Sequence, residues 1–332
     1  MLGVALLGLG RIGKIHLPNV LGNSRLELLY IVEENVNGVN EELAALGRAG
    51  KVAVVKSAEL DRVLGDARIT AVVICTPTDT HANLSIRSME AGKHVLCEKP
   101  LAEGRDAVSR CYDVAEKRGL ILMAAFNRRF DPSYRSLYTK VRAGEVGDIQ
   151  FIRTTFRDTP LWLGAETFSQ TFLSHDIDIV CWFAGGLPES VVCVGACHNS
   201  EVKENGDVDS CVVTMKFPGE IIGVIDFARY CSYGYDIRLE VFGTKGMLKM
   251  EPCLQTTVHE YSNAGKRDPP FAVSFPDRFK DAYLLELDHF IDAVEGKNKC
   301  EVTRFTSTAI STVIDAIRKS FHTQTIVKLS SA

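Results

Sequence analysis

Three closely spaced glycines near the start of the chain follow a short apolar run. Gly8, Gly10 and Gly13 form the pattern G-x-G-x-x-G and open a helical pattern, which is the context that a dinucleotide-binding loop requires. Gly8 permits a tight turn, Gly10 lets a pyrophosphate approach the backbone, and Gly13 allows close packing of helix on strand. The helix N-terminus then supplies N–H groups and partial positive charge for phosphates. We predict that this loop, Arg11 and Ile12 included, binds a dinucleotide; the alternative is a glycine-rich turn that binds nothing.

An acidic residue, Glu33, ends the second apolar run twenty residues after Gly13. A carboxylate at this point can accept hydrogen bonds from both hydroxyls of the adenosine ribose. It would repel a 2′-phosphate, and no arginine follows it to accept one, so the sequence favours NAD over NADP. The alternatives are a solvated carboxylate at a strand end, or Glu34 as the ribose partner.

A lysine follows the fourth apolar run in the order Glu98-Lys99-Pro100. This is the carboxyl edge of the predicted sheet, where doubly wound folds place their ligands. Lys99 is suited to orient a substrate hydroxyl, since the pKa of a lysine falls readily on partial burial. Pro100 would fix the local backbone. From these residues alone, a surface lysine after a strand is an equally good interpretation.

The first 125 residues repeat an apolar strand, a turn and a helical pattern. The expected strands are 4–8, 26–32, 71–75, 94–97 and 120–126, with helices between them such as 40–47 and 82–91. Strands that are apolar throughout, alternating with amphipathic helices, are typical of a parallel sheet covered on both faces. We therefore predict an N-terminal Rossmann domain with a doubly wound parallel sheet over residues 1–125.

Longer strands of alternating polarity follow residue 126. They are 190–198, 210–217, 221–230 and a hairpin within 239–250 that turns between Gly243 and Gly246; helices are expected at 282–294 and 306–321. This alternation indicates an antiparallel sheet with one covered face. The fold class is therefore α/β, with a C-terminal α/β domain of mainly antiparallel open sheet over residues 126–332.

The composition excludes several classes of protein. The 332 residues include 38 Lys+Arg and 42 Asp+Glu, so there is no basic excess for nucleic acid. The longest apolar stretch, which ends at Phe126, is too short to cross a bilayer. The ten cysteines contain no C-x-x-C, and the chain starts without a basic leader, so we expect a cytoplasmic protein with reduced thiols. The scattered histidines predict no metal site.

The motifs, taken in order, resemble the glucose–fructose oxidoreductase/inositol dehydrogenase/MocA (Gfo/Idh/MocA) family over essentially the whole chain. They are G-L-G-R-I-G, T-P-T-D-T-H from Thr76, and A-G-K-H-V-L-C-E-K-P-L-A. Four later segments are similar to bacterial myo-inositol 2-dehydrogenases: F-N-R-R-F-D, H-D-I-D, Y-G-Y-D-I and D-R-F-K-D-A-Y. The resemblance implies NAD(P)-dependent oxidation of a secondary alcohol on a cyclic polyol or sugar. It also implies that the domain over residues 126–332 binds the substrate and forms a homodimer or homotetramer, since relatives pair these sheets.

The resemblance assigns the central roles to two residues. Lys99 would contact the reacting hydroxyl near the nicotinamide, and His175 would be the general acid/base, because histidine exchanges protons near neutral pH. From the sequence alone, His175 is also interpretable as a helix-start histidine held by local hydrogen bonds. Thr171 stands where inositol dehydrogenases carry an Asp, and its hydroxyl supplies no charge. We expect a less basic His175, with reduced, redirected or lost inositol oxidation, and Asp176 is a doubtful replacement.

The resemblance implies further contacts for cofactor and substrate. The cofactor residues would include Thr76, Pro77, His81, Glu98 and Asn127, and the substrate residues Arg128, Asp158, Tyr235 and Tyr283. A polyol needs such converging groups, because each hydroxyl buried without a partner costs roughly 1–3 kcal/mol. For the two tyrosines the alternative is core packing with a satisfied hydroxyl.

Overall fold

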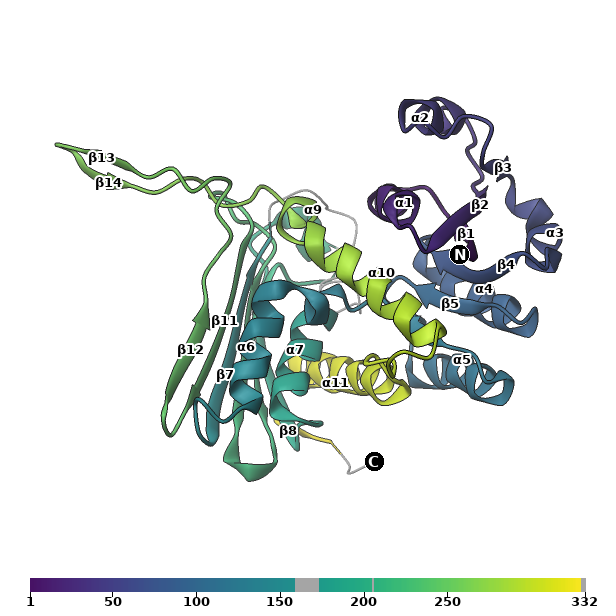
Figure 1. The fold of residues 1–332 in the computed structure, drawn as a ribbon. Coiled ribbons are helices and arrows are strands. Elements are labelled where there is room, and N and C mark those ends of the chain that lie inside the picture. The colour runs from purple at the N-terminus through teal and green to yellow at the C-terminus, as the bar shows by residue number, and fades with distance from the viewer. Residues whose placement is uncertain (159–172, 205, 330–332) are drawn as a thin grey trace. The chain divides into compact units, whose positions relative to one another are not determined.

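The computed structural model describes residues 1–158, 173–204 and 206–329, and the chain forms two compact units (Figure 1). Unit 1 consists of Met1–Asn127 and Tyr283–Thr308, and unit 2 of Arg128–Ala282 and Ala309–Ala332. The predicted division after residue 125 lies close to the first change of unit. No sequence pattern indicated that the later segment Tyr283–Thr308 folds with the N-terminal unit.

Unit 1 contains a six-stranded sheet in the order β3-β2-β1-β4-β5-β6, with every pair parallel. The strands are β1 (Leu2–Leu7), β2 (Leu26–Val32), β3 (Ala53–Val55), β4 (Ile69–Ile74), β5 (His94–Cys97) and β6 (Leu122–Ala124). This strand order is that of a doubly wound dinucleotide-binding fold. The predicted parallel sheet is confirmed, and β2 and β5 have the predicted bounds. The short strand β3 has no counterpart among the predicted strands.

Helices follow the strands of unit 1 and make the sheet a buried layer. They are α1 (Gly13–Gly22), α2 (Val39–Ala45), α3 (Leu60–Gly65), α4 (Thr78–Glu90) and α5 (Arg105–Arg118), with the 3-10 turn η1 (Ser57–Glu59). Residues 4–7 of β1 and 71–74 of β4 are at most 1% exposed. Central strands can be apolar throughout only where helices cover both faces, which is why the sequence pattern identified them.

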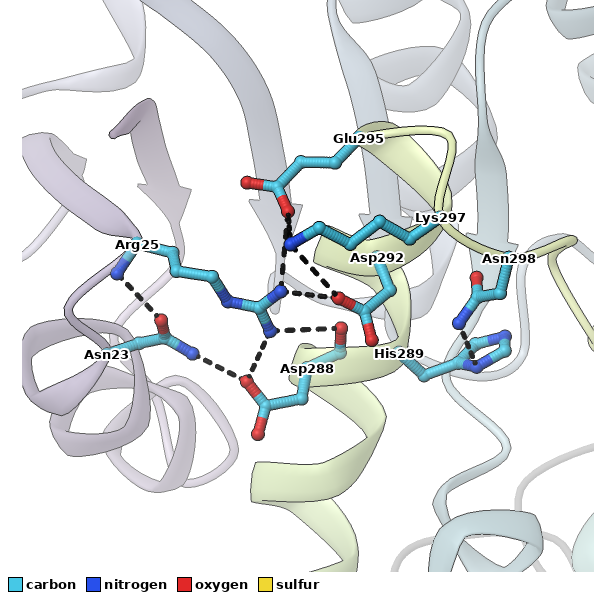
Figure 2. Close-up of polar contacts among 8 residues, drawn as sticks. All are labelled: Asn23, Arg25, Asp288, His289, Asp292, Glu295, Lys297 and Asn298. Carbon is cyan, nitrogen blue, oxygen red and sulfur yellow. Dashed lines mark hydrogen bonds and ion pairs between the residues drawn. The ribbon is translucent and has the colours of Figure 1, made fainter.

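The two long C-terminal helices are α10 (Lys280–Val294) and α11 (Arg304–Thr323), and each crosses a boundary between the units. Within unit 1, α10 contacts the turn before β2 through Arg25 (Figure 2). The Arg25 guanidinium donates to Asp288 Oδ1 at 2.8 Å and to Asp292, and it pairs with Glu295 at 3.4 Å. Two carboxylates of α10 and the carboxylate of Glu295, the residue after the helix, therefore surround Arg25.

Unit 2 contains a seven-stranded sheet in the order β12-β11-β7-β10-β9-β8-β15. Its strands are β7 (Ile149–Arg157), β8 (Ser190–Ala196), β9 (Ser210–Lys216), β10 (Ile222–Ala228), β11 (Asp236–Gly243), β12 (Gly246–Met250) and β15 (Val327–Lys328). Of the described pairs, β7–β10 is parallel and the others are antiparallel. The predicted mainly antiparallel sheet is confirmed, including the hairpin in which Gly243 pairs with Gly246.

One face of this sheet is covered by helices of the same unit. Figure 1 shows α6 and α7 on one side of it. The remaining elements of unit 2 are α6 (Pro132–Arg142), α7 (Ser174–Ala184), α8 (Ser200–Glu204), α9 (Phe275–Arg278), the 3-10 turn η3 (Pro218–Glu220) and the hairpin β13 (Glu260–Ser262) and β14 (Gly265–Arg267); the 3-10 turn η2 (Asn127–Phe130) precedes α6. Val213 on β9 is 0% exposed, whereas its neighbour Val212 is 45% exposed, as alternation on a half-covered sheet requires.

Within the described ranges, no helix has the length and hydropathy to span a bilayer.

Candidate functional site

The glycine-rich loop joins β1 to α1 in unit 1, and each glycine has its own steric reason. Gly8 has a φ of +85°, and a Cβ there would lie 2.8 Å from the backbone of Cys75. A Cβ on Gly13 would lie 2.2 Å from the Gly8 carbonyl oxygen, so a side chain would push helix and strand apart. A Cβ on Gly10, in contrast, would meet no atom within 4 Å. Gly10 therefore leaves an open approach to the backbone, as a phosphate ligand needs.

The groups around this loop fit a dinucleotide. Helix α1 has no side-chain cap at its N-cap residue Ile12, and the N–H groups of Lys14 and His16 donate to the backbone carbonyls of Gly10 and Ile12. The partial positive charge at the N-terminus of α1 favours an anion at this loop. Glu33, at the end of β2, accepts hydrogen bonds from Leu9 N at 2.6 Å and Asn35 N at 3.0 Å. These bonds hold its carboxylate beside the loop, where the ribose partner is predicted.

The turn that carries Lys99 is tied to the sheet at Glu98. The Glu98 N–H donates to the Ile74 carbonyl oxygen at 2.9 Å, which extends the pairing of β4 and β5 by one residue. Glu98 is 7% exposed, and its two carboxylate oxygens lie 2.9 Å from His16 Nε2 and 3.2 Å from the Lys99 N–H. The Lys99 side chain is half-buried, and the Lys99–Pro100 peptide bond is cis. His16 was not predicted as a site residue, because nothing in its spacing pairs it with Glu98.

His81 braces the two turns that follow β4 and β5. It is 2% exposed, and its ring nitrogens lie 2.7 Å from the Pro100 carbonyl oxygen and 2.8 Å from that of Thr76. The Thr76 hydroxyl is hydrogen-bonded to Thr80 at 2.7 Å. Both ring nitrogens of His81 thus contact protein carbonyls, so its effect on a cofactor would come through the shape of these turns. Asn127, which belongs to the same unit, is 3% exposed.

In unit 2, His175 lies in the first turn of α7 and is half-buried. The next residue, Asp176, is fully buried and pairs with Arg128, with Oδ2 2.9 Å from Nη1. Its carboxylate therefore has a partner other than His175, which supports the expectation that it does not replace the missing Asp. Thr171, the residue at that position, lies outside the described residues.

Two further buried ion pairs fix the segment before α6. Arg129 binds Asp178 of α7 through two nitrogens, with its shortest contact at 2.6 Å. Arg278 of α9 binds Asp131, which also caps α6. Adjacent arginines thus contact two acidic residues of α7 that are two positions apart. The sequence motifs N-R-R and H-D-I-D contain these partners, but single-sequence spacing does not show that they pair.

Two of the predicted substrate residues of unit 2, Arg128 and Tyr235, pack against the same two aromatic rings. The Arg128 guanidinium lies 4.9 Å from the Phe156 ring centre and 5.5 Å from that of Phe279, and the side chain is 1% exposed. Tyr235 is 4% exposed and packs edge-on against both rings; burial raises the pKa of its hydroxyl. Asp158 is half-buried at the end of β7. A contact between Arg128 and substrate remains a prediction, and this geometry shows it engaged with Asp176.

Tyr283, the other predicted substrate tyrosine, belongs to unit 1. It is 6% exposed, and its ring meets the His16 ring edge-on, with the centres 5.5 Å apart. Three residues on, Glu286 is also fully buried. The structure therefore places this tyrosine beside His16 in unit 1, whereas Tyr235 belongs to unit 2. Across the described part of the chain, no three His, Cys, Asp or Glu side chains are grouped to hold a metal ion.

Comparison with known proteins places both units in one family. Residues 2–126 match the GFO/IDH/MocA oxidoreductase family with its NAD-binding Rossmann fold, and residues 134–249 match the GFO/IDH/MocA C-terminal domain. The chain is 34% identical to the myo-inositol 2-dehydrogenase of Thermotoga maritima over 300 aligned residues, and this alignment covers 88% of each chain. It is 32% identical over 297 residues to the inositol 2-dehydrogenase of Rhizobium meliloti, covering 87% of this chain and 88% of that one.

Solved structures show the same likeness. A probable dehydrogenase from Thermotoga maritima has a TM-score of 0.92 at 32% identity, with 98% of both chains covered. The scyllo-inositol dehydrogenase of Lactobacillus casei, solved with bound NAD(H) and scyllo-inositol, has a TM-score of 0.90 at 25% identity over 100% of both chains. These matches confirm the resemblance predicted from the motifs. The chain therefore belongs to the Gfo/Idh/MocA family of oxidoreductases with an NAD-binding Rossmann fold.

Proposed function

We propose that this protein is an NAD-dependent dehydrogenase that oxidises a secondary alcohol of a cyclic polyol or sugar similar to myo-inositol. The observation that carries the proposal is the β1–α1 loop, where Gly10 opens the backbone to a phosphate and Glu33 lies beside it. Lys99 follows another strand of the same parallel sheet. Relatives named as inositol 2-dehydrogenases, at about one-third identity, support the substrate class.

The charge of Glu33 supports NAD as the cofactor. Its carboxylate is anchored by the Leu9 N–H and can accept from two ribose hydroxyls. A 2′-phosphate at the same place would bring a second negative charge against it, which costs binding energy unless a cation intervenes. We therefore expect NAD to bind more tightly than NADP.

The chemistry divides between a positioning amine and a proton acceptor. When bound, NAD would supply the hydride acceptor for the carbon that bears the reacting hydroxyl. Lys99 donates a hydrogen bond to that hydroxyl and fixes its orientation, and His175 accepts the hydroxyl proton as the carbonyl forms. Asn127, Arg128, Asp158, Tyr235 and Tyr283 remain the proposed partners of the cofactor and of the other substrate hydroxyls.

NADH absorbance, measured against a panel of inositols, other polyols and sugars, tests this function. We expect turnover of at least one cyclic polyol with NAD and slower turnover with NADP. Lys99→Met and His175→Gln should each lower kcat by at least about a hundredfold, the usual contribution of a positioned acid/base group, while NAD binding is kept. Binding of NAD without turnover of any panel member would contradict the proposal.

A second candidate function follows from Thr171. With no carboxylate four residues before His175, the imidazolium loses a stabilising charge, so the protein would be a family member with redirected or lost inositol oxidation. Thr171→Asp should then raise activity with inositols and move the acid limb of the pH profile of oxidation to higher pH, because His175 accepts a proton only when it is neutral and an added negative charge raises the pKa of a histidine. If the variant matches the parent in activity and pH profile, Thr171 does not limit the reaction.

We also propose that the protein acts in the cytoplasm as a homodimer or homotetramer. The resemblance to enzymes that pair their open sheets supports the assembly, and so do the exposed apolar side chains on the sheet of unit 2, Val194 and Val212 among them.

A further inference from the structure

A buried polar pair lies next to the turn of Lys99 in unit 1. His16, on α1, is 0% exposed, and its Nε2 lies 2.9 Å from Glu98 Oε1. Glu98 Oε2 accepts a hydrogen bond from the Lys99 N–H at 3.2 Å. One carboxylate therefore joins the helix that follows the glycine-rich loop to the backbone of the residue proposed to orient the substrate.

The surroundings of His16 restrict how its ring can turn. The Tyr283 ring contacts it edge-on at 5.5 Å between centres. Glu286, one turn further along α10, adds an acidic group near Glu98. A buried carboxylate such as that of Glu98 keeps its direction only while hydrogen-bond donors face it. If His16 did not donate, the Glu98 carboxylate would rotate toward another donor, and the acceptor for the Lys99 N–H would be displaced.

We propose that His16 is a positioning residue for this enzyme, holding the Lys99 turn in its working geometry through the carboxylate of Glu98. The inference rests on the proposed role of Lys99 as the group that contacts the reacting hydroxyl. His16 itself touches neither substrate nor reacting atoms in this scheme. Its contribution is that of a fixed donor behind a functional residue, where a small displacement has a large effect on rate.

Two polar substitutions of His16 distinguish a positioning role from a role in packing alone. The side-chain amide nitrogen of Gln corresponds in reach to imidazole Nε2, whereas that of Asn corresponds to Nδ1 and falls short of Glu98. His16→Asn should lower kcat by about 10- to 100-fold, as expected for a displaced orienting group, with KM and NAD affinity little changed. His16→Gln should recover most of the loss. If His16→Asn does not fold, His16→Leu fills the space without a donor and takes its place.

His94 provides the matched control. It lies at the start of β5, the strand that leads to Glu98, and its Nδ1 accepts a hydrogen bond from the Ile121 N–H at 2.9 Å. The amide oxygen of Asn can take the place of this acceptor, so His94→Asn should leave kcat near the wild-type value. Equal losses of kcat in His16→Asn and His94→Asn, or in His16→Asn and His16→Gln, would overturn the proposal in favour of general destabilisation.

A double-mutant cycle tests the route through Glu98. Glu98→Gln replaces one acceptor oxygen with an amide donor, so it should also lower kcat. If His16 acts through Glu98, the variant with both His16→Asn and Glu98→Gln should be no slower than Glu98→Gln alone, because contacting residues are not additive. Independent, multiplicative losses would place the effect of His16 elsewhere.

The rate at which an amine-reactive reagent labels Lys99, followed by mass spectrometry, gives a measurement that needs no substrate. The labelling rate should change in His16→Asn and return toward the wild-type value in His16→Gln. An unchanged rate in His16→Asn overturns the positioning role. If wild-type protein oxidises no polyol yet this labelling pattern holds, the proposed function fails and the positioning of Lys99 by His16 stands.

Discussion

Glu286 is an acidic residue that folding removes entirely from water. It is 0% exposed, and neither carboxyl oxygen has a hydrogen-bond partner in the described part of the chain. Burial, and secondly the negative charge of Glu98, raise its pKa well above the ordinary value of 4.5. Burial of the Cys75 thiol, together with nearby Glu98 and Glu286, also raises the pKa of that thiol. The folded protein therefore holds a proton on Glu286 at pH values where the unfolded chain has released it.

Because the pKa of Glu286 is raised in the folded state, its contribution to the stability of the protein falls as the pH rises. Below about pH 4.5 both states are protonated and the contribution of Glu286 is complete. As pH rises toward the folded-state pKa, the unfolded chain ionises alone, and the free energy of unfolding falls by up to about 1.4 kcal/mol per pH unit. Glu286→Gln mimics the neutral acid and should gain stability over wild type progressively with pH, as measured by urea unfolding at successive pH values.

Glu103 supplies the control for this series, because it is exposed and its substitution by Gln should leave the pH dependence unchanged. A Glu286→Gln protein that is less stable than wild type by a constant amount at every pH would contradict a protonated Glu286. That result would mean that the carboxylate is ionised and satisfied.

Helix α10 illustrates how single elements are held in unit 1. Asp288 and Asp292 are four residues apart, so they lie on one face of the helix, and Glu295 follows on the same side. Isolated exposed ion pairs contribute only about 0–1 kcal/mol, but Arg25 binds several carboxylates at once with its side chain 28% exposed. Asp288 lies 263 positions from Arg25 in the chain, so this contact anchors a late helix to an early turn.

The sequence predicted the elements whose local pattern alone decides their structure. Strands β2 and β5 are apolar runs bounded by turn signals, and the hairpin at Gly243 to Gly246 has its turn residues in place. Strand β7, an interior strand of its sheet, was not predicted. Its buried face includes Thr154 between Ile152 and Phe156, and charged residues alternate with them, so its apolar signal is weak.

The residues of the candidate site also fall into two groups: those that a local motif predicts and those that only tertiary packing brings together. The glycine loop, Lys99 and His175 belong to local motifs, and a motif can be recognised from one sequence. The pairs His16–Glu98, Arg128–Asp176 and Arg129–Asp178 join segments 48 to 82 positions apart, and their formation depends on tertiary packing. Spacing along one chain holds no record of such contacts, which is why the residues that position the predicted groups emerged only from the structure.

The chain as a whole has an uncovered sheet face that its own described helices do not protect. Two cross-strand pairs on this face are apolar and exposed: Val194 with Val212, which are 71% and 45% exposed, and Phe151 with Phe242, which are 39% and 41% exposed. Exposed apolar groups arranged over neighbouring strands mark an association surface more often than a solvated one. We expect a second copy of the chain to cover this face.

Opposite charges placed on one cross-strand pair test the assembly without breaking the sheet. Val194→Lys with Val212→Glu keeps a favourable pair within the chain, because these residues are direct neighbours. Across an interface the same charges would be desolvated, so the variant should sediment as a smaller species than the wild-type dimer or tetramer. Val258→Glu, an equally exposed valine outside this sheet, should leave the mass unchanged. Wild-type protein that sediments as a monomer, or a charged variant of undiminished mass, would show that the sheet face is not the assembly surface.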